Sequence, residues 1–134
     1  MSKYRDVFLE EATEHLAEMS RALLELEKDA ARAESIDLLF RMAHSIKGMA
    51  ASLEYDAITQ VAHRLEDHMQ EVRSAGVAVD VAGMALLFRG LEMLESMVAS
   101  VRETGEAPAH ALQLNPAAAA LVDPPDGEGA EKKA

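Results

Sequence analysis

The sequence predicts an all-α protein, an antiparallel up-and-down four-helix bundle with a short fifth helix. Four segments carry apolar residues in steps of three and four, the spacing that places side chains on one face of a helix. The chain has no Trp and only 4% aromatic residues, so Leu, Ala, Val and Met must fill the core, and this composition favours helices. No alternating segment rich in Val, Ile and Thr competes as a strand. At 134 residues, the chain suits one compact domain.

The first two helices are expected over residues 2–28 and 35–53. Ser35 is the expected N-cap of the second helix, because its hydroxyl can accept from a free backbone N–H of the first turn. The apolar stripe of the first helix is Phe8, Ala12, Leu16, Met19, Leu23 and Leu26, and that of the second is Ile36, Leu39, Ala43, Ile46, Ala50 and Leu53.

The third and fourth helices follow with clear end signals. The glycine of SAG, residues 74–76, is expected to stop the third helix, and Asp80 is expected to cap the fourth. Gly105 and Pro108 end the fourth helix. Their stripes are Ile58, Val61, Ala62, Leu65, Met69 and Val72, and then Met84, Leu87, Phe88, Leu91, Leu94, Val98 and Val101.

Beyond Pro108, the stretch NPAAAALVD predicts a short fifth helix that packs through Leu121 and Val122. We therefore expect one domain over residues 1–122. The last residues, 123–134, read DPPDGEGAEKKA and contain no apolar anchor larger than alanine. This composition predicts a disordered linker or tail.

Charge and composition exclude several classes of protein. A formal net charge of −11 argues against nucleic-acid binding, which needs a basic surface. Without cysteine the chain has no disulfide, thiolate metal site or thiol nucleophile. No stretch approaches the ~18 consecutive apolar residues of a membrane span, and the N-terminus has no apolar signal core. We expect a cytoplasmic protein that does not insert directly into a membrane.

A candidate site lies in RMAHSIKGMA, residues 41–50. His44 falls at the edge of the buried stripe, about 100° around the helix from Ala43, so it should be at least partly exposed. Lys47 and Gly48, three and four residues on, share its face. Glycine costs about 1 kcal/mol against alanine inside a helix, which calls for a reason. Phosphorylation of His44 supplies one: Lys47 and Arg41 could stabilise phosphate oxygens, and Gly48 would leave room for a partner's active site.

A carboxylate on the third helix supports this interpretation. If the second and third helices are antiparallel neighbours, Glu66 of AHRLED falls at about the height of His44, because both are nearly equidistant from the loop near residue 55. Glu66 could then accept a hydrogen bond from Nδ1–H of His44. Nε2 would be left unprotonated and facing outward, which is the nucleophilic form of the ring.

Three other interpretations stay open at this point. A surface histidine on a helix is most often only a solvated side chain. A metal-binding bundle could use His44, His63, Glu66 and Asp67, although di-iron bundles need paired Glu-x-x-His motifs and the chain has none. A non-catalytic helical interaction module is a further alternative, which leaves Lys47, Gly48 and Glu66 without explanation.

The residues resemble a known family. FRMAHSIKGMA followed by AHRLE, together with FLEEATEHLAEMSRALLELE, is similar to the histidine phosphotransfer (HPt) domains, and specifically to the N-terminal P1 domain of CheA chemotaxis histidine kinases. The resemblance covers about residues 4–105. It implies that His44 is phosphorylated, that Glu66 orients it, that Lys47 and His63 support the site, and that Gly48 is the small neighbour that gives partners access.

One departure lies between the second and third helices. Where the family commonly has a Phe-Gly-Phe-like turn, this chain has Leu53, Glu54 and Tyr55. The turn is structural, so we do not expect the departure to alter the chemistry.

The resemblance implies a phosphoryl carrier of a bacterial two-component chemotaxis system. His44 would accept the ATP γ-phosphoryl from a separate histidine-kinase catalytic domain, in cis or in trans, and pass it to an aspartate of a receiver domain of the CheY or CheB type. The chain contains no nucleotide-binding motif. We therefore expect a monomeric fragment of a protein-histidine kinase that binds no cofactor or metal itself, the partner kinase domain using Mg-ATP. A stand-alone phosphorelay protein is the alternative.

Overall fold

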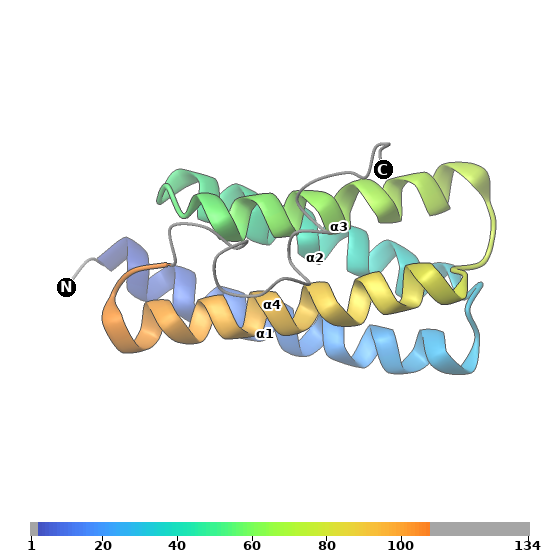
Figure 1. Ribbon diagram of the computed structural model, residues 1–134, viewed down its shortest axis with the longest axis horizontal. Coiled ribbons are helices and arrows are strands. Elements are labelled where there is room, and N and C mark those ends of the chain that lie inside the picture. Colours follow the sequence, from blue (N-terminus) through green and yellow to red (C-terminus); the bar gives the residue numbers. More distant parts are fainter. Residues whose placement is uncertain (1–2, 108–134) are drawn as a thin grey trace, which may run out of the picture.

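The structure is a computed structural model, which describes residues 3–107. Its elements are α1 (Lys3–Lys28), α2 (Ala33–Ser52), α3 (Asp56–Ala75) and α4 (Val81–Thr104). The helices alternate in direction along the long axis of the bundle (Figure 1). The predicted all-α, up-and-down four-helix bundle is thus confirmed over the described residues.

Each helix packs against the two helices that neighbour it in the order α1, α2, α3, α4 and back to α1. Within the described residues, the backbones of the diagonal pairs, α1 with α3 and α2 with α4, do not approach one another closely. Every predicted stripe residue of α1 and α3 is buried, as are those of α2 up to Ala50. In α4 the prediction holds for Leu87, Leu91, Leu94, Val98 and Val101, but Met84 and Phe88 are only half-buried and two unpredicted residues, Met93 and Met97, are buried.

The helix ends largely follow the predicted signals. Gly76 and Gly105 take the left-handed conformation at the ends of α3 and α4, with φ of 66° and 81°. Asp80 caps α4, since its Oδ1 accepts from the backbone N–H of Gly83 at 2.7 Å.

The predicted cap of α2 is wrong. The helix begins at Ala33, so the N-cap is Arg32 and Ser35 lies buried inside the first turn, 4% exposed. The Asp29 side chain accepts from the N–H of Ala31, and Arg32 pairs with Glu34 at 2.9 Å. These contacts organise the preceding turn, and Glu34 in the first turn favours the positive end of the helix dipole.

The two ends of the bundle are closed differently. At one end the two connecting segments are tied together, because Val79 N–H donates to the Ala30 carbonyl at 2.9 Å and Val79 is buried. At the other end residues 53–55 form the short corner between α2 and α3. Glu54 there has a φ of 63°, unusual for a residue with a side chain. The Tyr55 ring packs edge-on against Phe8 of α1, with centroids 5.3 Å apart.

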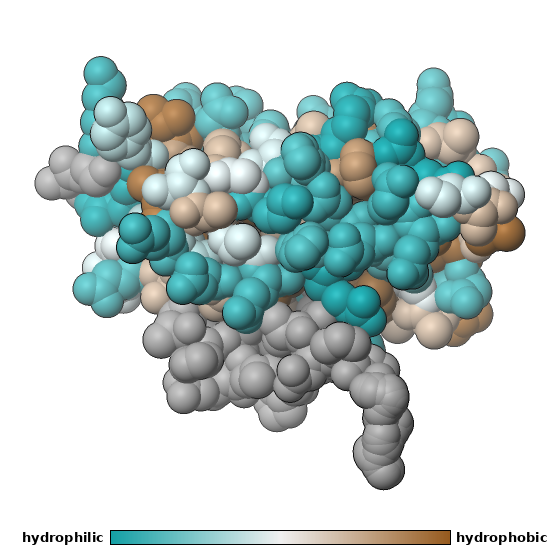
Figure 2. All heavy atoms as spheres, turned by 90° about the horizontal axis from the view of Figure 1, so that it is seen from above, coloured by the Kyte–Doolittle hydropathy of each residue, from teal (hydrophilic) through white to brown (hydrophobic). Residues whose placement is uncertain are grey.

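The face of the bundle shown in Figure 2 is mostly hydrophilic, with hydrophobic patches toward its ends. No helix within residues 3–107 is long and apolar enough to cross a membrane. The predicted fifth helix and the predicted domain boundary at residue 122 lie outside the described residues.

Candidate functional site

His44 projects from the outer side of α2. Its side chain is 63% exposed, while Ala43 and Ile46 on either side of it in the helix are fully buried. This arrangement follows from the apolar spacing of α2, which turns the buried line toward the core and leaves position 44 outside it. The predicted exposure of His44 is confirmed.

Glu66 of α3 reaches across to His44. Its Oε2 lies 2.5 Å from His44 Nδ1, and its other oxygen, Oε1, lies 2.5 Å from Lys47 Nζ. Only 11% of the Glu66 side chain is exposed, against 27% of that of Lys47. The nearly buried carboxylate of Glu66 therefore contacts both His44 and Lys47, which lie on the same face of α2.

The protonation state of Glu66 is set by opposing effects. Burial raises the pKa of this carboxyl, but the contacts and charges of Lys47 and His44 outweigh burial, so the pKa lies below its ordinary value of 4.5. Glu66 is therefore ionised at neutral pH.

An ionised Glu66 fixes the tautomer of His44. A carboxylate without a proton can only accept, so Nδ1 of the ring carries the hydrogen and donates it. In a neutral imidazole this leaves a lone pair on Nε2. The arrangement presents an exposed nitrogen nucleophile with a carboxylate that can stabilise positive charge on the ring.

Lys47 and Arg41, the two cations predicted to stabilise a phosphoryl group, each contact a carboxylate. Lys47 pairs with Glu66, and Arg41 Nε donates to Asp37 Oδ2 at 2.9 Å, one turn back on α2. The sequence analysis assigned both cations to phosphate oxygens. In the structure their charges lie on the same helix as His44, but each contacts a carboxylate.

His63 lies near Glu66 on α3 and contacts Asp67, with Nε2 3.4 Å from Oδ1. Ligand atoms of His63, Glu66 and Asp67 fall within 4.8 Å of one another, so three residues of the metal-site alternative come together. Glu66, however, already contacts His44 and Lys47. The remaining pair is two side chains that are each 56% exposed, and such pairs are common on helix surfaces.

Gly48 has open space above it. A Cβ atom built on this residue would meet no atom within 4 Å, apart from its chain neighbours and its own helix backbone. Packing within the described chain therefore does not require a glycine at this position. The role of Gly48 in partner access stays a prediction.

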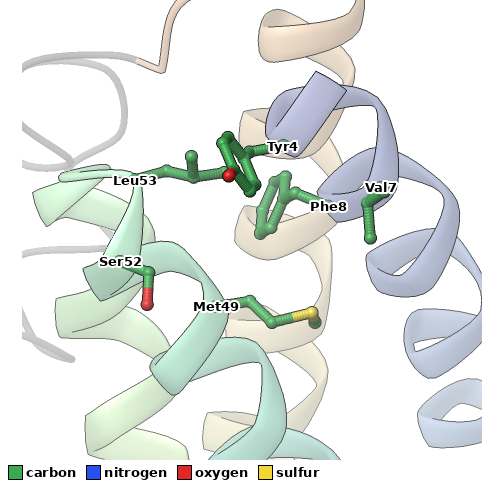
Figure 3. Close-up of a pocket in the computed structure, with 6 residues that line it drawn as sticks. All are labelled: Tyr4, Val7, Phe8, Met49, Ser52 and Leu53. Carbon is green, nitrogen blue, oxygen red and sulfur yellow. The ribbon is translucent and has the colours of Figure 1, made fainter. Parts of the chain in front are cut away.

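An apolar pocket of about 360 Å³ lies further along α2, at the end of the bundle (Figure 3). Tyr4, Val7 and Phe8 of α1 line it from one side, and Met49, Ser52 and Leu53 from the other. The described residues that line this pocket include no carboxylate, imidazole or amine, which leaves exposed His44 and nearly buried Glu66 as the candidate reactive groups.

The sequence analysis missed three contacts around His44. The Phe40 ring lies almost parallel to the imidazole, Arg73 of α3 covers Phe40, and Ser45 Oγ lies 3.0 Å from His15 Nε2 of α1. The spacing of four between Phe40 and His44 signalled the first contact. The other two join different helices, whose relative rotation the sequence does not give.

The family is decided by the comparison with known domains. The model of the Hpt domain family matches residues 3–104, nearly all of the described bundle. The chain belongs to the Hpt domain family.

Relatives of this Hpt domain include the chemotaxis protein CheA of Halobacterium salinarum, 30% identical over 129 residues, which are 96% of this chain and 19% of that protein. CheA of Bacillus subtilis is 36% identical over 106 residues, 79% of this chain and 16% of that protein. The Hpt chain thus spans less than a fifth of the length of these relatives.

Two solved structures share the fold. The CheA phosphotransferase domain from Thermotoga maritima is 30% identical with a TM-score of 0.70, covering 76% of this chain and 99% of that one. The phosphorylated P1 domain of CheA3, in complex with CheY6 from R. sphaeroides, is 25% identical with a TM-score of 0.75, covering 81% of this chain and 85% of that one. The resemblance stated from the sequence is confirmed.

Proposed function

We propose that this Hpt domain is a phosphoryl carrier of a bacterial chemotaxis system, with His44 as the phosphorylated residue. The observation that carries the proposal is the contact of exposed His44 with nearly buried, ionised Glu66. This contact gives a surface nitrogen the tautomer and the charge partner that nucleophilic attack needs. Relatives named CheA and a neighbour named as a phosphorylated P1 domain support the same role.

The first step is phosphorylation by a separate histidine-kinase catalytic domain that holds Mg-ATP. Nε2 of neutral His44 attacks the γ-phosphorus, the Nε2–P bond forms, and the bond between phosphorus and the bridging oxygen breaks to release ADP. The Nδ1 proton stays in its bond to Glu66, whose negative charge offsets the positive charge on the ring. Positioning and electrostatics supply most of the rate in such transfers.

The second step passes the group to an aspartate of a receiver domain of the CheY or CheB type. A carboxylate oxygen attacks phosphorus, the Nε2–P bond breaks, and the electron pair returns to Nε2. Glu66 keeps the proton of the His44 ring on Nδ1 throughout, so Nε2 is unprotonated and ready for another cycle. The neighbour in complex with CheY6 supports a receiver as partner.

Access to Nε2 depends on the surface around it. We assign this role to Gly48, because the space above it is open and a partner must close over the ring. Lys47 holds Glu66 in its ionised form, and His63 beside Asp67 is a supporting polar residue. We place the domain in the cytoplasm, where Mg-ATP and receivers are found.

The test is to incubate the chain with a separately purified CheA catalytic core, radiolabelled Mg-ATP and, in parallel, the variants His44→Gln and His63→Gln. His63 is the matched control, an exposed histidine of the next helix. We expect label that acid removes and base does not on the wild type, and none on His44→Gln. His63→Gln should still be labelled, at a lower rate, because His63 supports the site but does not accept the phosphoryl group. Helicity should be equal in all three.

Equal labelling of His44→Gln would refute the assignment of the site. Adding a purified receiver to the labelled wild type then tests the second step. Label is expected to leave the chain and appear on the receiver. Retention of the label with several active receivers would contradict the proposed carrier role.

A further inference from the structure

Phe40 lies one helical turn before His44, on the same side of α2. The two ring centroids are 6.3 Å apart and the ring planes differ by 17°. Offset, nearly parallel arrangements at this separation are a favourable geometry for aromatic pairs. The imidazole therefore has an aromatic face beside it, in addition to the carboxylate at its edge.

The Phe40 ring is itself held from the next helix. The guanidinium carbon of Arg73 on α3 lies over this ring, 4.3 Å from its centroid. Arg73 is anchored in turn, because its Nη2 lies 3.3 Å from Asp37 Oδ1, and the other Asp37 oxygen accepts from Arg41. Cations are attracted to aromatic faces, so Arg73 restrains the position of Phe40.

An exposed histidine needs such restraint to act as a precise nucleophile. The torsion that turns an imidazole about its Cβ–Cγ bond is broad, and 63% of the His44 side chain is open to solvent. Glu66 fixes the Nδ1 edge of the ring, but a single hydrogen bond permits tilting about its own axis. A neighbouring flat surface removes that freedom.

We propose that Phe40 is a positioning residue for His44: its ring, held by Arg73, sets the plane of the imidazole so that Nδ1 stays on Glu66 while Nε2 faces the partner. The proposal rests on the proposed function of His44 as phosphoryl acceptor. Phe40 acts through His44 and takes no part in bond making.

Hydrophobic packing alone could also explain a phenylalanine at position 40, since the residue is half-buried against the core. A leucine fills much of the same apolar space but offers no flat face, and a tyrosine keeps the face. Phe88 of α4 is a matched control, because it too is half-buried, and within the described residues the backbones of α4 and α2 are not adjacent.

The test compares Phe40→Leu, Phe40→Tyr and Phe88→Leu with the wild type. In the free protein, the imidazole ¹⁵N shifts of His44 report its tautomers above pH 7. We expect one dominant tautomer of His44 in the wild type, in Phe40→Tyr and in Phe88→Leu. In Phe40→Leu the ¹⁵N shifts should average between the values of the two tautomers. The phosphorylation rate by the kinase core should fall roughly two- to tenfold in Phe40→Leu alone, the effect of losing one aromatic pair.

The outcomes separate the possible roles. Unchanged ¹⁵N shifts in Phe40→Leu overturn the proposal. If the phosphorylation rate is nevertheless lower, Phe40 contacts the kinase. If the rate is unchanged as well, packing is the only role of Phe40. If Phe40→Leu unfolds, Arg73→Gln replaces it, with partial averaging expected and unchanged shifts overturning the proposal. If the wild type accepts no label, the proposed function has failed, while the ¹⁵N shifts still decide whether Phe40 positions the ring.

Discussion

Lys47 and Glu66 form an ion pair of 2.5 Å between α2 and α3, on the carboxylate oxygen that His44 does not use. The pair gives Lys47 a specific task, since it keeps Glu66 charged in a nearly buried position. A charged Glu66 is what fixes the tautomer of His44. The three residues therefore act as one unit, and changing any one should alter the other two.

Glu66→Gln should slow phosphorylation of His44 without abolishing it, because the nucleophile remains. A hydrogen bond to a charged group contributes about 1.5–3 kcal/mol, which predicts a rate roughly 10- to 100-fold lower. Single-turnover labelling by a CheA core measures the rate. The control is Asp67→Asn, which removes a neighbouring exposed carboxylate and should label normally. A loss as complete as in His44→Gln would show that Glu66 does more than orient the ring.

Lys47→Met should raise the pKa of Glu66, because burial then acts with less opposition. In the wild type the folded-state pKa lies below 4.5, so the contribution of Glu66 to stability is complete above 4.5 and is lost as the pH falls through the folded-state value. The variant should lose part of that contribution. Carboxyl ¹³C shifts and urea unfolding between about pH 3 and 7 measure both effects.

The control for this substitution is Lys28→Met, which removes an exposed lysine at the end of α1. It should leave the Glu66 titration unchanged. An equal Glu66 pKa in Lys47→Met and the wild type would mean that the ion pair is too weak in solution to matter.

Gly48→Ala should separate stability from function. The added Cβ meets open space, so the free energy of unfolding should rise by about 1 kcal/mol through helix propensity. Phosphorylation or transfer should slow, because the methyl group occupies the approach to His44. Urea unfolding and labelling rates measure the two effects. Gly90→Ala is the opposite control: its Cβ would lie 2.5 Å from Leu65, so this variant should be less stable. Unchanged rates in Gly48→Ala would remove the access role.

Glu54→Gly should stabilise the fold. A residue with a side chain at a φ of 63° costs roughly 1–2 kcal/mol, and glycine avoids this cost but gives the unfolded chain about 0.4–1 kcal/mol of extra entropy. The net gain should be about 0.5–1 kcal/mol by urea unfolding. Glu54→Ala keeps the strained conformation and should show no such gain. Labelling of His44 should be unaffected by either change.

Much of this fold could be predicted because its signals are local. The buried lines of α1 and α3, the glycines at 76 and 105 and the cap at Asp80 all follow from spacing and end chemistry. The N-cap of α2 was predicted wrongly at Ser35, because the turn before α2 determines where the helix starts. The contact of Arg32 with Glu34 organises this turn, so the helix begins before Ser35.

The contact of His44 with Glu66 could also be predicted. The two residues are about equally far along the chain from the corner between α2 and α3, so they lie at the same level along the two antiparallel helices. The position of Arg73 could not. Arg41 contacts Asp37 at a spacing of four within α2, a pairing that the sequence signals, whereas Arg73 lies over Phe40 because of the rotation of α2 against α3. That rotation is a property of the packed bundle.

Both His44 and Glu66 of the proposed site, and all their described polar contacts, belong to α2 and α3, which a corner of residues 53–55 joins. The proposed site thus lies on one hairpin of helices, and α1 and α4 supply the rest of the core against which this hairpin packs. Substitutions on the outward faces of α1 and α4 can accumulate without disturbing the contact between His44 and Glu66. The outer faces of α1 and α4 can therefore change in sequence while the proposed site on α2 and α3 is kept.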